Sequence, residues 1–168
     1  ALEACKPNKA ISGKKNKHAK NISEGKVRKV LEKVEAQATE VSNVVDDAIA
    51  KVERMRNKAL EYSKLGRLSD TIKVGRAAID AYNVATKAVA QLLVTIKAAT
   101  TIERTFKKGK AGSTFNNFEQ NLHETDKEKL MKAKLVAREA EAVAKAAKQA
   151  KAEAKKAQAE AEAEAEAE

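Results

Sequence analysis

The chain has 168 residues, a formal net charge of +10, 35% charged residues and 3% aromatic residues, with no Trp. So few bulky side chains exclude a domain built around a thick aromatic core. The single cysteine, Cys5, excludes an internal disulfide, and no apolar stretch approaches the roughly 18 to 20 residues that a membrane span needs. The composition predicts a thin, all-α protein.

Residues 1–22 form a basic segment that we expect to be flexible. The triplet Asn21-Ile22-Ser23 at its end is the one N-glycosylation sequon in the chain. A glycan on Asn21 is chemically feasible if the protein is secreted, although such a triplet also arises by chance about once in a chain of this size. The lysines that concentrate positive charge here are Lys6, Lys9, Lys14, Lys15, Lys17 and Lys20.

The first predicted helix spans about residues 24–64 and carries a coiled-coil-like apolar seam. It ends at Gly66, which can adopt a left-handed conformation, and Ser69 or Asp70 can cap the next helix. Such a short link favours an antiparallel hairpin. A seam this regular can also pair between two copies, so a homodimer stays open as an alternative. The seam consists of Val27, Leu31, Val34, Ala38, Val41, Val45, Ala48, Val52, Met55, Ala59 and Tyr62.

The second predicted helix spans about residues 70–106. Its apolar residues cover a broad face, which suits a central helix that packs against two others. Two glycines then break the pattern, and the segment 107–122 is predicted to be a loop that contains Phe115 and Phe118. These two aromatic residues either anchor the loop to the end of the bundle or form an exposed recognition site, and the first alternative is favoured because aromatic residues are scarce.

The third predicted helix begins at about residue 125. Thr125 and Glu128 have the spacing of a capping box, in which each side chain accepts from the other residue's amide. An apolar stripe follows and fades to alanine after Val143, so residues 145–168 are predicted to project as a stalk. The Ala-Glu repeat ends in mid-pattern, so we expect the parent polypeptide to continue beyond Glu168. The stripe consists of Leu130, Ala133, Leu135, Val136, Ala137, Ala140, Val143 and Ala144.

These segments predict an all-α fold: an elongated, antiparallel three-helix bundle over residues 23–144, coiled-coil-like, with a projecting Ala/Glu-rich C-terminal helix. Residues that could bind a metal or take part in catalysis occur without the partners that such sites need. His18 and His123 have no partner at metal-ligand spacing, Cys5 has no neighbouring base in a motif, and Asp46-Asp47 fits a solvated helix face. We therefore predict no catalytic, metal or cofactor-binding residues, and no enzyme.

The long Val/Ala-seamed helices, the scarcity of aromatic residues and the Ala/Lys/Glu-rich sequence from Glu139 to Glu168 together resemble the glutamic acid/alanine-rich protein of trypanosomes. That family consists of stage-specific surface coat proteins. The resemblance implies an extended helical bundle on the extracellular face of the plasma membrane. It also implies a C-terminal glycosylphosphatidylinositol anchor beyond this chain and neighbouring coat molecules as partners. The lone Cys5 departs from the disulfide-bearing pattern of many coat proteins, and the net charge fits the family name only if a longer acidic repeat follows.

Three classes of function stay open. The favoured one is a structural coat protein whose stalk holds the bundle away from the membrane. The alternative is a surface receptor on the same scaffold, with its ligand at the membrane-distal loop 107–122. The third is a nucleic-acid-binding protein, because Lys/Ala-rich sequence also occurs in linker-histone tails. It ranks last, since Glu interrupts every lysine cluster of the third helix.

Overall fold

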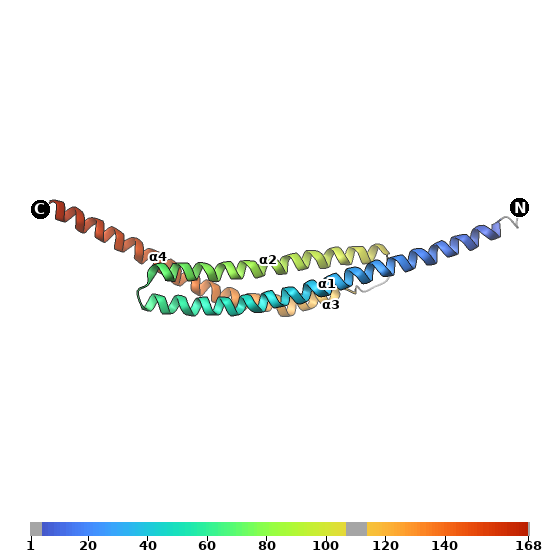
Figure 1. Cartoon of the computed structure of the whole chain (residues 1–168), viewed down its shortest axis with the longest axis horizontal. Helices are drawn as coiled ribbons and strands as arrows, with labels where there is room; N and C mark the ends of the chain where they lie inside the picture. The colour runs from blue at the N-terminus through green and yellow to red at the C-terminus, as the bar shows by residue number, and fades with distance from the viewer. Residues whose placement is uncertain (1–4, 107–113, 168) are drawn as a thin grey trace. The chain divides into compact units, whose positions relative to one another are not determined.

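The computed structural model describes residues 5–106 and 114–167, with side chains from Glu24 onward. Over these ranges the chain is helical and contains no strand, so the all-α prediction is confirmed. Figure 1 labels the α-helices α1 (Cys5–Lys64), α2 (Leu68–Phe106), α3 (Asn116–Asn121) and α4 (Lys127–Ala167). The π-helix η1 (Leu122–Asp126) connects α3 to α4.

The helices contribute to two compact units, which we describe separately. Unit 1 combines residues 1–40 with residues 90–122, and unit 2 combines residues 41–89 with residues 123–168. Both α1 and α2 therefore supply one part to each unit. The predicted seam of α1 is confirmed in both parts, because each of its members is buried or half-buried.

Unit 1 has a small core in which α1, α2 and the start of α3 meet. Phe115, just before α3, is fully buried, whereas Phe106 at the end of α2 is 39% exposed. The Lys26 ammonium of α1 lies 5.6 Å from the centre of the Phe106 ring, within the range of a cation–π interaction. The other buried apolar residues of this unit are Val27, Val34, Leu92, Ile96, Ala99 and Leu122.

Unit 2 is built on α2, which packs against both α1 and α4. The prediction of a central second helix is therefore confirmed here. One core cluster joins Val52 of α1, Ala81 of α2 and Ala137 of α4, and the half-buried Tyr82 and Val136 pack against it. Most buried residues of the unit are alanine or valine, so its helices are held by many small contacts.

The turn between α1 and α2 confirms the predicted hairpin and its glycine. Gly66 has a φ of +71°, a backbone conformation that residues other than glycine rarely adopt. The Gly66 amide donates to the Ser63 carbonyl at 3.1 Å, and the Arg67 amide donates to the Tyr62 carbonyl at 2.9 Å. These two bonds form a Schellman motif. The Arg67 guanidinium also lies 4.8 Å from the centre of the Tyr62 ring.

The predicted caps of α2 are wrong. The helix begins at Leu68, so Ser69 and Asp70 lie inside its first turn. Asp70 instead pairs with Arg67 at 2.7 Å, where its charge also complements the positive end of the helix dipole. The hydroxyl of Ser69 accepts from the Lys151 ammonium of α4 at 3.0 Å. The start of α1 also differs from its expected position near residue 24, because the helix begins at Cys5.

The predicted start of the third helix at Thr125 is also wrong. Helix begins earlier, at Asn116, and Thr125 lies within the π-helix η1, so no capping box forms there. Buried positions occur at residues 122, 126 and 130, two successive intervals of four. A regular helical seam alternates four with three, and a π-helix accommodates the additional residue by widening one turn.

The buried face of α4 ends close to Val143, the predicted position. Ala144 and Ala147 are still buried, whereas every described side chain from residue 148 to residue 167 is exposed. The last buried position is therefore one turn beyond the predicted Val143, which is half-buried. Leu135 was wrongly included in the stripe: its side chain is 68% exposed, because it falls on the opposite side of the helix from Ala133 and Ala137.

Gly75 of α2 lies at a close approach between α2 and α4 in unit 2. A Cβ atom built on Gly75 would lie 2.5 Å from the Ala144 Cβ and 2.9 Å from the Ala140 carbonyl oxygen. Both separations are shorter than van der Waals contact. Gly75 thus allows the backbones of α2 and α4 to approach more closely than alanine would permit.

We expect Gly75→Ala to lower the free energy of unfolding by about 1 to 3 kcal/mol, measured by urea denaturation. The added methyl has no space, and this cost exceeds the gain in helix propensity of roughly 1 kcal/mol. Gly25→Ala is the matched control, because nothing lies within 4 Å of a Cβ at Gly25 of α1. That substitution should be neutral or stabilising. Equal stabilisation by both substitutions would contradict the close approach at Gly75.

Candidate functional site

The two predicted loop aromatics lie at the start of α3 in unit 1. Phe115 is fully buried and Phe118 is half-buried, with their ring centres 6.4 Å apart. The anchoring role is therefore correct for Phe115, and the alternative of an exposed recognition site is wrong for this residue. The rest of the proposed loop, residues 107–113, lies outside the described residues.

Glu103 of α2 fixes the backbone beside Phe115. Its carboxylate oxygen Oε1 accepts from the Thr114 amide at 2.9 Å, just before α3 begins. The residue is only 4% exposed, and its second oxygen, Oε2, is buried without a hydrogen-bond partner. Sequence reasoning missed Glu103, although it follows Ile96 and Ala99 at the spacing of buried positions.

A second buried acid, Asp126, lies at the end of η1 in unit 2. Its residue is 8% exposed, and burial raises the pKa of its carboxyl above the ordinary value. The neighbouring Lys129 ammonium acts in the opposite direction, while the Asp46 carboxylate adds to the rise. π-Helical turns occur frequently at functional positions in proteins. The charged cluster of Asp126, Lys129 and Asp46 is therefore the chemically most distinctive feature among the described residues of unit 2.

Lys129 connects the cluster to α1. Its ammonium donates to the Asp46 carboxylate at 2.9 Å, and this bond raises the pKa of Lys129. Sequence analysis assigned Asp46 to a solvated face; its side chain is 55% exposed but forms this ion pair with α4. A second cross-helix pair joins Arg56 and Glu139 at 3.4 Å. Both pairs orient α4 against α1, although partly exposed ion pairs contribute little stability.

A shallow groove of about 310 Å³ runs beside this cluster, between α1 and α4. Apolar atoms form most of its surface, and charged side chains stand along both edges. It has no set of convergent groups that would bind and orient a substrate. Its lining residues are Asp46, Ile49, Glu53, Lys129, Lys132, Ala133 and Val136.

Several candidate residues from the sequence lie outside the described side chains. These are Asn21, the possible glycosylation site, together with His18 and Cys5. His123 is described and lies exposed in η1. Among the described residues, no three His, Cys, Asp or Glu side chains come together as metal ligands.

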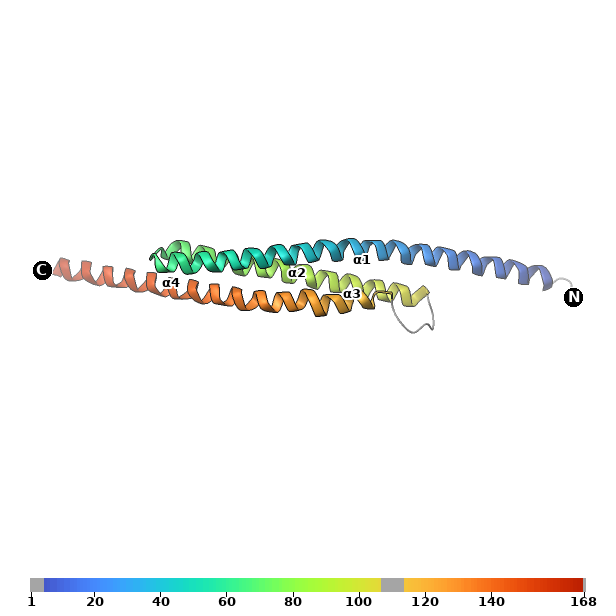
Figure 2. The same cartoon turned by 90° about the horizontal axis from the view of Figure 1, so that it is seen from below.

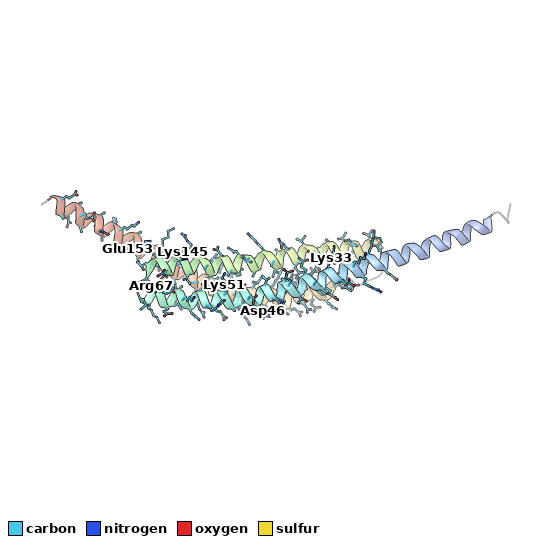
Figure 3. The ribbon with its side chains drawn as sticks, viewed as in Figure 1. Lys33, Asp46, Lys51, Arg67, Lys145 and Glu153 are labelled. Carbon is cyan, nitrogen blue, oxygen red and sulfur yellow. The ribbon has the colours of Figure 1, made fainter. Side chains whose placement is uncertain are left out.

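The most extensive exposed feature of unit 2 is the end of α4, which we call the stalk helix, residues 148–167. Figure 2 shows it continuing alone past the turn between α1 and α2. Figure 3 labels Lys145 and Glu153 on either side of its start. Its lysines all lie in its first half, together with Glu153, and its other glutamates lie in its second half. Just before it, Glu141 and Lys145 form an ion pair at 3.5 Å. No helix in the described part of the chain has both the length and the apolar character needed to cross a membrane.

We expect Asp126→Asn to raise the free energy of unfolding near pH 7 by on the order of 1 kcal/mol. The pKa of Asp126 is higher in the folded than in the unfolded chain, so its stabilising contribution is complete below the unfolded pKa. That contribution is lost as the pH rises through the folded pKa. The advantage of the Asn variant should therefore shrink on acidification, as measured by urea denaturation between pH 3 and pH 8.

Asp46→Asn is the matched control for this experiment. It removes a partly exposed carboxylate from the same cluster, and we expect only a small change in stability. An Asp126→Asn advantage that stays constant with pH would contradict the assignment to Asp126 ionisation.

We expect Glu103→Ala to lower the free energy of unfolding by about 1 to 2 kcal/mol, because the Thr114 amide loses its acceptor. Amide hydrogen exchange at the start of α3 should also accelerate, since this part of the chain is less firmly held. Glu32→Ala, on the exposed face of α1 in the same unit, is the matched control. Indistinguishable behaviour of the two variants would show that the Glu103 hydrogen bond does not hold this segment.

No protein-family model matches this chain, and neither the curated proteins nor the solved structures searched give a significant match.

Proposed function

We propose that the chain is a structural coat protein of a cell surface, in which the stalk helix holds the helical units away from the membrane. One observation carries this proposal. α4 continues as a helix from Lys148 to Ala167 after its last buried residue, Ala147. At 1.5 Å per residue, this exposed extension is about 30 Å long.

The composition of the stalk helix supports a spacer. Its residues are Ala, Lys, Glu and Gln, which favour helix without requiring burial. A local bond from the Gln158 amide to the Glu162 carboxylate, at 3.2 Å, adds weak support along the helix. Because only alanine supplies apolar surface, the segment can stay solvated, as a spacer must.

The resemblance to the glutamic acid/alanine-rich protein of trypanosomes supports the cellular setting. On this reading the protein lies on the extracellular face of the plasma membrane, a C-terminal lipid anchor joins it to the bilayer, and other coat molecules are its neighbours. The receptor alternative is weaker, because buried Phe115 cannot contact a ligand without leaving the core of unit 1.

The proposal predicts that antibodies label the protein on intact, unpermeabilised cells that express it. Treatment with a phospholipase C specific for phosphatidylinositol should release the protein into the medium, because that enzyme cleaves the proposed anchor. A cytosolic protein serves as the control for membrane integrity. Labelling that requires permeabilisation would contradict the proposal, and retention on DNA that weakens with salt would favour the nucleic-acid alternative.

A further inference from the structure

The outward side of α4 in unit 2 carries two large apolar side chains. Met131 is 69% exposed and Leu135 is 68% exposed, and no other large apolar side chain among the described residues is more exposed. They are four residues apart and therefore lie together on one side of the helix. A single exposed apolar residue is ordinary, whereas an adjacent pair forms a patch whose burial is favourable. We call this pair the α4 patch.

The α4 patch lies apart from the contacts that hold unit 2 together. Ala133, Ala137 and Ala140 are buried and occupy the opposite side of α4. A helix with apolar residues on two sides is suited to two sets of partners, and methionine is among the residue types enriched in protein interfaces. Because the side that carries the α4 patch faces outward, a partner for it has to come from another molecule.

The charged residues around the α4 patch follow a coiled-coil pattern. With Leu135 at an a position and Met131 at the preceding d position, Lys134 falls at g and Glu139 at e. These two exposed residues therefore lie on opposite flanks of the patch. The Glu139 carboxylate also pairs with Arg56 at 3.4 Å, and its remaining acceptor sites can bind a second cation. Opposite charges on the two flanks favour a partner that carries the same two charges in reverse order.

The same charge pattern continues along α4 into the stalk helix. In a parallel pair of identical helices, each g residue of one copy lies beside the e residue five positions further along the other copy. Three such pairs join opposite charges: Lys134 with Glu139, Lys148 with Glu153, and Lys155 with Glu160. The pair that begins at Lys127 joins two lysines, and the pair that begins at Glu141 joins a carboxylate with alanine. A second copy of α4 therefore supplies charges that complement both flanks.

We propose that the α4 patch packs against the α4 patch of a second copy of this chain, with the two α4 helices parallel. A two-fold axis along the helices brings Met131 and Leu135 of both copies together. It also sets the g flank of each copy against the e flank of the other. An antiparallel pair would instead set g residues against g residues. Four of the five g positions from 127 to 155 are lysine, so that arrangement brings like charges together.

The seam between the two copies is interrupted, so the association should be weak. Arg138 and Lys145 fall at the two d positions that follow Met131. A polar residue at a core position of a coiled coil lowers its stability while it specifies the register. The long side chains of both residues can extend past the seam, so that their charged groups stay in water. We therefore expect an equilibrium between monomer and dimer rather than a permanent dimer.

Sedimentation equilibrium of the full chain, over concentrations up to about 1 mM, tests the pairing. The apparent mass should rise from the 18.2 kDa of one chain toward twice that value. Leu135→Glu should raise the dissociation constant at least about tenfold, because it places like charges at the centre of the patch. Val84→Glu is the matched control: Val84 is 60% exposed but lies on α2, so this change should leave the dissociation constant unaltered. A wild-type chain that stays monomeric, or equal weakening by both substitutions, would overturn the proposal.

Charge reversal in the stalk helix tests the parallel orientation. Lys148→Glu and Glu153→Lys should each weaken the dimer a few-fold, and the double variant, which exchanges the two charges, should restore the wild-type dissociation constant. Both side chains are exposed and lie beyond the last buried residue of α4, so neither change disturbs the core. Strengthening by Lys148→Glu alone, as an antiparallel pair predicts, would overturn the parallel arrangement. A double variant weaker than either single variant would overturn it as well. The pairing needs only α4, so its failure would leave the coat proposal standing.

Discussion

Close packing of small side chains is the constraint on which unit 2 depends. Gly75 lies against Ala140 and Ala144, and much of the surrounding core is alanine or valine. Dispersion forces are strong only at short range, so small residues stabilise a helix pair only if the backbones approach closely. The glycine makes that approach possible, and the alanine spacing of α4 extends it to Ala147.

The same constraint explains where the bundle ends. An alanine methyl contributes roughly 0.8 kcal/mol or less when buried, so it adds stability only against an opposing helix surface. Where α1 and α2 turn at Gly66, α4 loses its partner and its remaining alanines become solvated. Close to that turn, the Lys151 ammonium of α4 donates to the Ser69 hydroxyl of α2. The stalk helix is thus the part of α4 that extends past the turn of the hairpin.

Two acids, Glu103 and Asp126, occupy positions at which the helical spacing predicts buried apolar residues. Both lie near the start of the third helical run, which consists of α3, η1 and α4. Glu103 accepts from the Thr114 amide, and Asp126 lies at the end of the π-helix. Burying a carboxyl costs stability unless it gains hydrogen bonds or loses its charge. Glu103 gains one bond, whereas burial raises the pKa of Asp126. In both cases an acidic side chain is buried close to where the chain enters its third helical segment.

The α1 seam, the turn at Gly66, the central role of α2 and the exposure of the C-terminal residues could all be predicted from the sequence. Each depends on local periodicity or on the conformation of one residue, so one sequence contains the necessary information. The true starts of α2 and of the third helical run could not be predicted in this way. Ser69, Asp70 and Thr125 are good capping residues by type, but the neighbouring Arg67 and the continuous helix through η1 give them other positions.

The sequence by itself therefore determined an all-α chain with alanine and valine seams and a C-terminal segment that has nothing large to bury. Only the tertiary structure decided which acids are buried, that Phe115 is an anchor, and that Leu135 and Val94 face outward. Periodicity describes one helix at a time, whereas burial depends on which faces meet. That information arises from contacts between residues such as Gly75 and Ala144, which lie far apart in the chain.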